Sequence, residues 1–250
     1  QQKINDDENN QCVIIKENDV LYKTYPYASS NSQKTGFYCD QRQNRFNVAK
    51  LCNEKRVLDL CCYNGGFALN AMIHGNASFC TGVDSSPIAI QAAIENAQLN
   101  GIVSADGDGN NIDDEKMKFV QDDIANFMKS ANDEGEEYDV IVLDPPKLAP
   151  SVSGLLRASR KYNALNRDAI KLINKQEGGL LLTCTCSGAM TQKDGGQFFL
   201  QTVKEAALSA GRHITLLQSS GAASCHTQCP ASFPAGAYLT ASLFFVSPSE

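Results

Sequence analysis

Two apolar segments of the sequence end in side chains that can do chemistry. One, Leu180 to Cys186, carries Cys184 and Cys186, and the other ends at Asp144. Because side chains alternate along a strand, the two cysteines are expected to face the same side, with Cys186 at the carboxyl end. A thiol in this position becomes a nucleophile when its proton is removed. We predict that Cys186 and Asp144 are catalytic and that Cys184 is an inert core thiol.

Further acids follow three other apolar segments. Asp59, Asp84 and the pair Asp122-Asp123 each stand where a predicted strand ends. After Asp59 the chain passes through glycines into a helix, which lets a ligand approach the backbone closely. The G-x-G-x-x-G pattern of dinucleotide sites is absent, and an acid suits a cationic ligand better than a pyrophosphate. S-adenosylmethionine (SAM) carries an ammonium and a sulfonium group, so the three acids together predict a SAM pocket.

Two acids of this series also have a structural alternative. Asp84 lies near the spacing at which an acid binds ribose hydroxyls in Rossmann-type folds, or it caps the next helix with Ser85 or Ser86. Asp123 contacts the adenine amine or caps the helix that follows it. For Asp123 we favour the contact, because it completes the series.

The residue after Asp144-Pro145-Pro146 helps to choose the reaction. Paired prolines hold an extended backbone, and an aromatic residue after them would indicate methylation of an exocyclic base amine. Lys147 stands there instead. The thiolate of Cys186 would add to carbon 6 of cytosine, which makes carbon 5 nucleophilic enough to accept a methyl group. Asp144 would hydrogen-bond the base and neutralise developing charge.

Strand-like and helix-like segments alternate through most of the chain, which indicates a parallel sheet with helices on both faces. Before this alternation, Gln11 to Tyr27 is predicted to form a hairpin that turns at Asn18-Asp19, and a helix is predicted to end within Asn47 to Asn53. The predicted strands are Arg56 to Cys61, Ala77 to Asp84, Lys118 to Gln121, Tyr138 to Asp144, Leu180 to Cys186, His213 to Gln218 and Ala237 to Val246. The predicted helices are Phe67 to His74, Ile88 to Asn100 with Gly101 after it, Ile124 to Ser130, Leu155 to Asn174 and Gln197 to Ala210.

This order predicts an α/β fold with a seven-stranded, doubly wound Rossmann-like methyltransferase sheet whose last strand is antiparallel. In such sheets ligands bind at the carboxyl ends of the strands. We expect residues 1–33 to be an N-terminal hairpin and connector, and residues 34–250 to be the SAM-dependent methyltransferase domain.

Composition argues for a protein with a substantial core and without a membrane segment. Hydrophobic residues make up 42% of the chain, and no apolar run approaches the length that spans a bilayer. The net charge of −6 argues against nucleic-acid binding by bulk charge, but much of the acid lies in Asp106 to Glu115 and Asp133 to Glu137. We predict a cytoplasmic protein, or an organellar one in a eukaryote. Its oligomeric state stays open, with a homodimer as one alternative.

The cysteines are expected to be reduced. Most of the ten lie in apolar segments, where thiols behave as small hydrophobic groups. Cys225, His226 and Cys229 resemble a metal motif, but no second pair lies at a suitable spacing. We therefore predict no metal.

Several motifs together resemble the bacterial 23S rRNA large-subunit methyltransferase I family, which makes 5-methylcytosine. They are Lys34-Thr-Gly-Phe-Tyr-Cys-Asp-Gln-Arg-Gln-Asn-Arg45, Asp59 to Phe67, Asp144 to Lys147, Thr185 to Gly188 and Phe233 to Leu239. The resemblance implies an RNA substrate, Cys186 as the nucleophile, and SAM bound in a pocket under the first motif. The residues assigned to that pocket are Lys34, Gln41, Asp59, Tyr63, Gly65, Phe67, Asp84, Ser85, Asp123 and Asp144.

The chain departs from that family in two places. The family carries an N-terminal RNA-binding PUA domain, which we do not expect in this chain. Its Asp-His-Pro loop is replaced by Cys225-His226-Thr227. Two other functions stay open: a guanine methyltransferase of the related KTG-containing family, and a non-catalytic RNA-binding or ribosome-assembly module.

Overall fold

The computed structural model describes residues 12–25, 36–103, 116–226 and 232–249. Its centre is a seven-stranded sheet with the strand order β5-β4-β3-β6-β7-β9-β8. The strands are β3 (Arg56–Leu60), β4 (Phe79–Asp84), β5 (Met117–Gln121), β6 (Val140–Leu143), β7 (Gly179–Thr185), β8 (Ile214–Ser220) and β9 (Thr240–Val246). The first five are parallel to one another, and β9 runs antiparallel to both β7 and β8. The predicted fold class is confirmed, including the antiparallel last strand.

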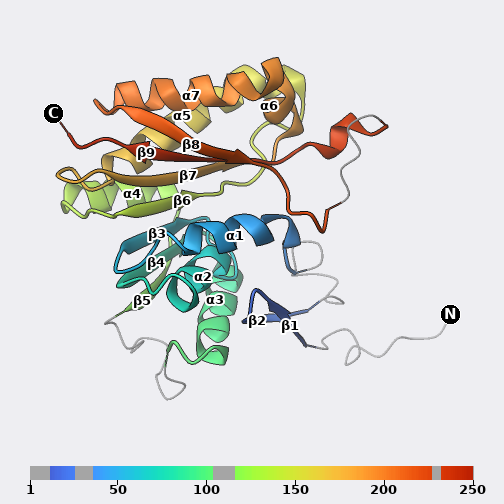
Figure 1. Cartoon of the computed structure of the whole chain (residues 1–250), viewed down its shortest axis with the longest axis vertical. Helices are drawn as coiled ribbons and strands as arrows, with labels where there is room; N and C mark the ends of the chain where they lie inside the picture. The colour runs from blue at the N-terminus through green and yellow to red at the C-terminus, as the bar shows by residue number, and fades with distance from the viewer. Residues whose placement is uncertain (1–11, 26–35, 104–115, 227–231, 250) are drawn as a thin grey trace.

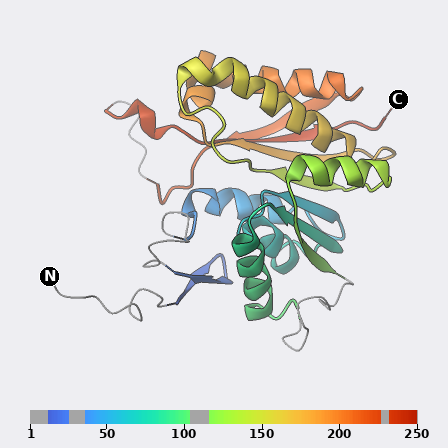
Figure 2. The ribbon, with the colours of Figure 1, turned by 180° about the vertical axis from the view of Figure 1, so that it is seen from behind.

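Helices cover both faces of this sheet (Figure 1 and Figure 2). The helices are α1 (Arg42–Ala49), α2 (Gly66–Ile73), α3 (Pro87–Leu99), α4 (Ile124–Asp133), α5 (Leu155–Lys171), α6 (Gly188–Gln192) and α7 (Gln197–Ser209), with short 3₁₀ turns η2 (Cys39–Gln41), η3 (Val152–Gly154), η4 (Lys193–Gly196) and η5 (Pro234–Gly236). Side chains of α1, α2 and α3 share one buried cluster with the sheet, and those of α4, α5 and α7 share another on the opposite face. The sheet is therefore sealed from both sides and is accessible at its strand ends.

The N-terminal hairpin packs onto the domain. Strands β1 (Val13–Glu17) and β2 (Val20–Thr24) turn at Asn18-Asp19, where both residues have positive φ, as predicted. The outer edge of β2 is bonded by asparagine side chains of α3: Leu21 N donates to Asn100 Oδ1 at 2.9 Å, and Lys23 N to Asn96 Oδ1 at 2.8 Å. The hairpin thereby satisfies its free backbone groups against α3.

A buried ion pair ties the hairpin to α1. The guanidinium of Arg45 bonds Glu17 Oε1 at 2.7–2.8 Å and donates to the carbonyl of Tyr38 at 2.6 Å. Both charged side chains are buried, so each one satisfies the charge of the other. Glu17 of the hairpin, Arg45 of α1 and the carbonyl of Tyr38 are thus joined in one bonded group.

Most predicted elements match within a few residues, and one short helix was not predicted. The first helix begins at Arg42 and ends at Ala49, so the prediction that it ends within Asn47 to Asn53 is met at its early side. Helix α6 was not predicted, because its five residues are too short to show periodicity. The acidic stretch Ser104 to Glu115 lies outside the described residues. Within the described part of the chain, no helix is both long and apolar enough to cross a membrane.

Candidate active site

Three of the predicted acids meet at one edge of the sheet. Asp59 lies in β3, Asp84 ends β4 and Asp144 directly follows β6. These strands are neighbours with parallel pairing, so their carboxyl ends lie together. The sequence prediction that these acids converge is confirmed for these three strands.

Asp59 is a buried carboxylate, and only one of its two oxygens accepts a hydrogen bond from the described residues. Its Oδ2 accepts a hydrogen bond from Ala68 N at 3.0 Å, at the start of α2. Its Oδ1 is buried and has no hydrogen-bond partner among the described residues. Burial, and then the nearby Asp144 and Asp84, raise the pKa of Asp59 to about 7. A buried acid in this state favours a cationic partner.

Asp84 joins two loops at the site. Its Oδ2 accepts from Tyr63 N at 3.0 Å, and its Oδ1 accepts from Ser86 N at 2.9 Å. The helix cap predicted as one alternative is made by Ser86, whose Oγ accepts from Ala89 N. Ser85 is exposed between them. Asp84 therefore positions the loop after β3, which the sequence alone did not show.

The loop after β3 has an unusual backbone. Cys61, Tyr63 and Gly65 all have positive φ, with values of 64°, 50° and 84°. At Gly65 a Cβ would lie 3.3 Å from both Ala93 and Phe119 in addition to this backbone strain, so glycine is required there. Left-handed backbone at non-glycine residues is costly and clusters at functional sites. The strained loop holds the backbone at the amino end of α2 toward the acids.

Three of the predicted pocket residues are buried in the core, cap a helix or lie outside the described residues. Phe67 is buried in the core cluster. Asp123 caps α4, with Oδ1 accepting from Ala125 N at 2.9 Å, so the structural alternative for Asp123 is realised. Lys34 lies outside the described residues. A contact between any of these three and a cofactor stays a prediction.

Asp144 is held from the opposite side by the segment that precedes α1. Gln41 Nε2 donates to Asp144 Oδ2 at 3.0 Å, and Asn44 Nδ2 donates to Gln41 Oε1 at 2.7 Å. Burial raises the pKa of Asp144 to about 6, although the Gln41 bond opposes the shift. Asp144 is thus fixed in place and titrates near neutral pH.

Cys186 stands one residue beyond β7, between two anchored neighbours. Thr185 and Ser187 are fully buried, and Thr185 Oγ1 lies 2.8 Å from the hydroxyl of Tyr162. Ser187 Oγ accepts from Ala149 N at 3.1 Å, on the segment that follows Asp144. Cys186 itself is partly exposed, whereas Cys184 is buried in the core, as predicted. Buried Thr185 and Ser187 therefore hold Cys186 in place, with part of the residue exposed to solvent.

The electrostatics of Cys186 link it to Asp144. Burial, followed by the negative charge of Asp144, raises the pKa of the Cys186 thiol. Burial, followed by the negative charge of Asp144, also raises the pKa of Cys184, so the carboxylate acts on both cysteines at the end of β7. The resting site therefore keeps Cys186 protonated, and a thiolate there requires a group that takes its proton or offsets the charge of Asp144.

Aromatic residues from distant segments border the same site. Tyr38 packs edge-on against Tyr63, with ring centroids 5.2 Å apart. The hydroxyl of Tyr238 donates to Asp40 Oδ2 at 2.7 Å. Burial, then Asp40 and then Cys186, raise the pKa of both Tyr38 and Tyr238. The motif of Tyr38 was predicted to lie over the pocket, whereas no position was predicted for the motif of Tyr238, and neither side chain was given a role.

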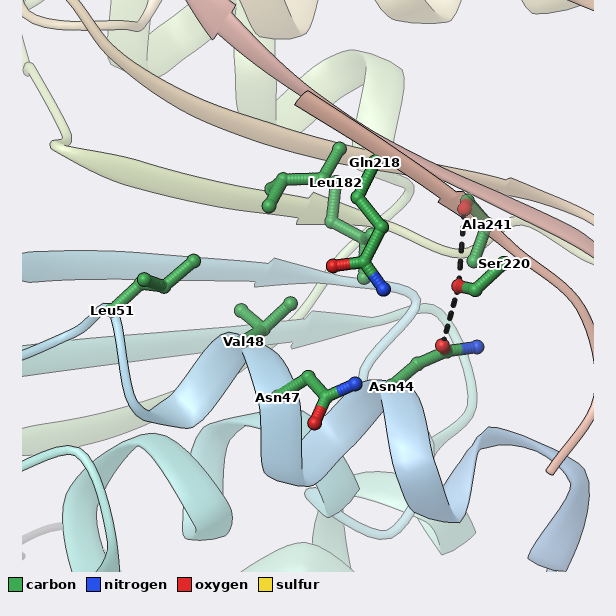
Figure 3. Close-up of a pocket in the computed structure, with 9 residues that line it drawn as sticks. Asn44, Asn47, Val48, Leu51, Leu182, Gln218, Ser220 and Ala241 are labelled. Atoms are coloured by element: carbon green, nitrogen blue, oxygen red, sulfur yellow. Dashed lines mark hydrogen bonds between the residues drawn. The ribbon is translucent and has the colours of Figure 1, made fainter. Parts of the chain in front are cut away.

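A small hollow near this region is a separate feature (Figure 3). It lies between α1 and the β7-β9-β8 part of the sheet, with Asn44, Val48 and Gln218 among its lining residues, and it measures about 30 Å³. This is room for about one or two water molecules. The hollow is too small for a nucleoside, and it is not lined by Asp59, Asp84, Asp144 or Cys186, so the candidate site remains the strand ends that carry those residues (the strand-end site).

A strained strand–loop–helix junction, three acids on adjacent strands and this sheet order define the class I methyltransferase fold. Solved structures agree over nearly the whole chain. SMU.776, a protein complexed with SAH, has a TM-score of 0.76 at 22% identity, covering 98% of this chain and 57% of its own. Trm5b from Pyrococcus abyssi has a TM-score of 0.64 at 19% identity, covering 96% and 57%. The SAM-dependent methyltransferase from Agrobacterium tumefaciens has a TM-score of 0.58 at 18% identity, covering 96% and 71%.

The chain belongs to the family described as conserved hypothetical protein 95, whose family model matches residues 39–204. It is also 38% identical to ribosomal RNA large subunit methyltransferase I of Escherichia coli (strain K12). The 209 aligned residues make up 84% of this chain. The protein of that name in Shigella boydii has the same identity and coverage. The chain spans 48% of the length of these relatives.

Proposed function

We propose that this chain is a SAM-dependent methyltransferase that forms 5-methylcytosine in large-subunit ribosomal RNA through a covalent bond to Cys186. The observation that carries the proposal is the placement of Cys186. Its thiol is partly exposed between two buried, bonded neighbours at the end of β7, and β7 pairs with the strand that leads to Asp144. The 38% identical relatives carry the name of a ribosomal RNA methyltransferase, which supports RNA as the substrate.

The residues at the strand ends fit a cationic cofactor. Asp59, Asp84 and Asp144 bring three carboxylates together, and Asp59 keeps a buried oxygen without a partner. Asp59 would hold the amino-acid end of SAM, Asp84 the ribose, and the backbone around Gly65 would face the cofactor. When bound, SAM supplies an electrophilic methyl group on a sulfonium. A cationic group among these acids would also offset the charge that keeps Cys186 protonated.

The protein's own groups then act on the base. Cys186 loses its proton to solvent and its sulfur adds to carbon 6 of cytosine, which turns carbon 5 into a nucleophile toward the methyl group. Asp144, whose pKa is raised to about 6, would hydrogen-bond the base and neutralise the charge that develops on it. After transfer, a base removes the proton from carbon 5 and the bond to Cys186 breaks. The base must leave its stack to reach the thiol.

A basic segment next to the site supports RNA as the partner despite the acidic chain. Residues 147–161 contain Lys147, Arg157, Arg160 and Lys161 and no acid, and all four side chains are exposed. This segment follows Asp144 and leads into α5. Clustered Lys and Arg side chains supply the phosphate contacts of nucleic-acid binding.

The product of the reaction tests the proposal. The chain would be incubated with SAM that carries a labelled methyl group and with protein-free large-subunit ribosomal RNA, and the nucleosides of the digest separated. We expect the label in 5-methylcytidine. Label in methylguanosine would overturn the cytosine assignment in favour of a guanine methyltransferase. SAM binding with no label in any RNA nucleoside would favour the binding-module alternative.

A further inference from the structure

Two cysteines and a histidine meet at the surface beside the site. Cys39 begins η2, whereas Cys225 and His226 lie in the segment that follows β8. The Nδ1 atom of His226 is 4.0 Å from the sulfur of Cys39 and 3.8 Å from the sulfur of Cys225. All three potential ligand atoms lie within 4.8 Å of one another. The prediction of no metal did not consider this set, because Cys39 stands far from the other two in the sequence.

Main-chain contacts hold the cluster together. Ala223 N donates to Asp40 O at 2.8 Å, and His226 N donates to Ala223 O at 2.8 Å. The thiol of Cys225 lies 3.3 Å from the carbonyl oxygen of Cys39. The two segments are thereby joined before any ion is considered, so an ion would find its ligands already in place.

The geometry matches tetrahedral coordination by thiolate and imidazole. Bonds of about 2.3 Å to sulfur and about 2.0 Å to nitrogen place tetrahedral ligand atoms roughly 3.5–3.8 Å apart. The two sulfur–nitrogen distances of 4.0 and 3.8 Å are within a few tenths of an ångström of this range. Both cysteines are free and exposed, so an ion reaches them from solvent.

We propose that Cys39, Cys225 and His226 bind one Zn²⁺ ion, with water in the fourth position. The donor set selects this ion, because soft thiolates with imidazole favour zinc over the oxygen-preferring Mg²⁺ and Ca²⁺. Binding converts two thiols to thiolates and releases two protons to solvent. The oxidation state of the zinc ion does not change, so binding needs no oxidant or reductant.

The bound ion would join two segments that border the site. The η2 turn carries Asp40, which accepts the bond from Tyr238, and Gln41, which holds Asp144. The ion would link this turn to the segment after β8. It would therefore stabilise the part of the strand-end site near Cys186. Asp59 and Asp84, on the other part, would be unaffected.

Cobalt binding to the full chain tests the proposal directly. The chain would be reduced, treated with a chelator and titrated with Co²⁺ under anaerobic conditions, followed by competition with Zn²⁺. We expect one Co²⁺ per chain, with thiolate-to-cobalt charge-transfer absorption that Zn²⁺ abolishes. Since loss of an outer-shell partner costs about 10–100-fold in affinity, Cys39→Ser and Cys225→Ser should each lower metal affinity by about 100-fold or more.

The control is Cys12→Ser, which removes an exposed cysteine outside the cluster and should leave the titration unchanged. Absence of thiolate absorption in the reduced chain would overturn the proposal. So would full absorption in the Cys39→Ser, Cys225→Ser double variant. A reduced chain that forms a Cys39–Cys225 disulfide in air but takes up no Zn²⁺ also contradicts it. Metal binding is measured without SAM or RNA, so the result is independent of the proposed methyl transfer.

Discussion

The two sides of the strand-end site are held in place by different kinds of contact. On the β3–β4 side, Asp59 and Asp84 bond backbone groups of the loops and helix that directly follow their own or a neighbouring strand. On the β6–β7 side, Asp144 depends on Gln41, and Tyr238 depends on Asp40, which is 198 residues away in sequence. The first side is a local strand–loop–helix structure, and the second is assembled from distant segments. We expect changes on the first side to affect cofactor binding and changes on the second to affect the reaction on RNA.

The largest expected effect is at Cys186. Cys186→Ala removes the proposed nucleophile, so methyl transfer to RNA should fall by about 10³-fold or more, while SAM affinity stays within about twofold. Both are measured on the same preparation, by labelled methyl transfer and by calorimetry. Cys184→Ala is the matched control, because Cys184 lies in the same strand end but is buried. Equal losses in the two variants would contradict Cys186 as the nucleophile, and a matching loss of SAM affinity in Cys186→Ala would contradict the division between the two sides.

Asp59→Asn should separate stability from cofactor binding. The folded-state pKa of Asp59, about 7, lies above the unfolded value of about 3.9, so between these pH values the folded chain binds more protons. The stability contributed by the protonated form is present below about pH 4 and is lost as the pH rises to about 7. At pH 8 the Asn variant without cofactor should be more stable than the parent by roughly 2–4 kcal/mol, and it should bind SAM more weakly.

Denaturant unfolding at pH 4 and pH 8 checks this prediction, with calorimetry for SAM. The stability difference between Asp59→Asn and the parent should nearly vanish at pH 4. A variant that is less stable than the parent at pH 8 would show that Asp59 is satisfied in the folded chain, and the argument for a cationic ligand would then fail.

The exposed basic residues of α5 give a smaller effect that is confined to RNA. Neutralising both residues with Arg157→Gln and Arg160→Gln should weaken RNA binding and reduce the salt dependence of log K by about 2, if each side chain contacts one phosphate. SAM affinity should not change. Lys129→Gln, an exposed charge on α4, is the control. An unchanged salt dependence would place the RNA on another surface.

The smallest expected effect tests the hydrogen bond between Gln41 of η2 and Asp144. The Gln41 bond favours the ionised carboxylate, so Gln41→Leu should raise the pKa of Asp144 further above about 6. The pH profile of methyl transfer should move upward by up to about one unit. Gln43→Leu, which changes an exposed residue at the start of α1, should leave the profile in place. Identical profiles for both variants would show that Asp144 does not control the pH dependence.

The same contrast explains what the sequence could predict. Asp59, Asp84 and Asp144 were identified because the ends of neighbouring parallel strands converge by geometry. The bond from Tyr63 to Asp84 was not, since it depends on the positive φ of the loop. The pair Tyr238–Asp40 and the cluster of Cys39 with Cys225 and His226 join segments distant in sequence. Their meeting depends on how loops pack over the sheet, and a single sequence carries no periodic signal for it.

The central claim is that the Cys186 thiol attacks the base at the strand ends that carry Asp59, Asp84 and Asp144. The most direct measurement is intact-mass spectrometry of the chain after incubation with SAM and ribosomal RNA containing 5-fluorocytosine. In this base, fluorine replaces the proton on carbon 5 that must be removed before the bond between carbon 6 and Cys186 can break. We predict a covalent protein–RNA adduct in the parent chain and in Cys184→Ala, and none in Cys186→Ala. Methylation of unmodified cytosine at carbon 5 without any adduct on the fluorinated RNA, or an adduct that persists in Cys186→Ala, would contradict the account.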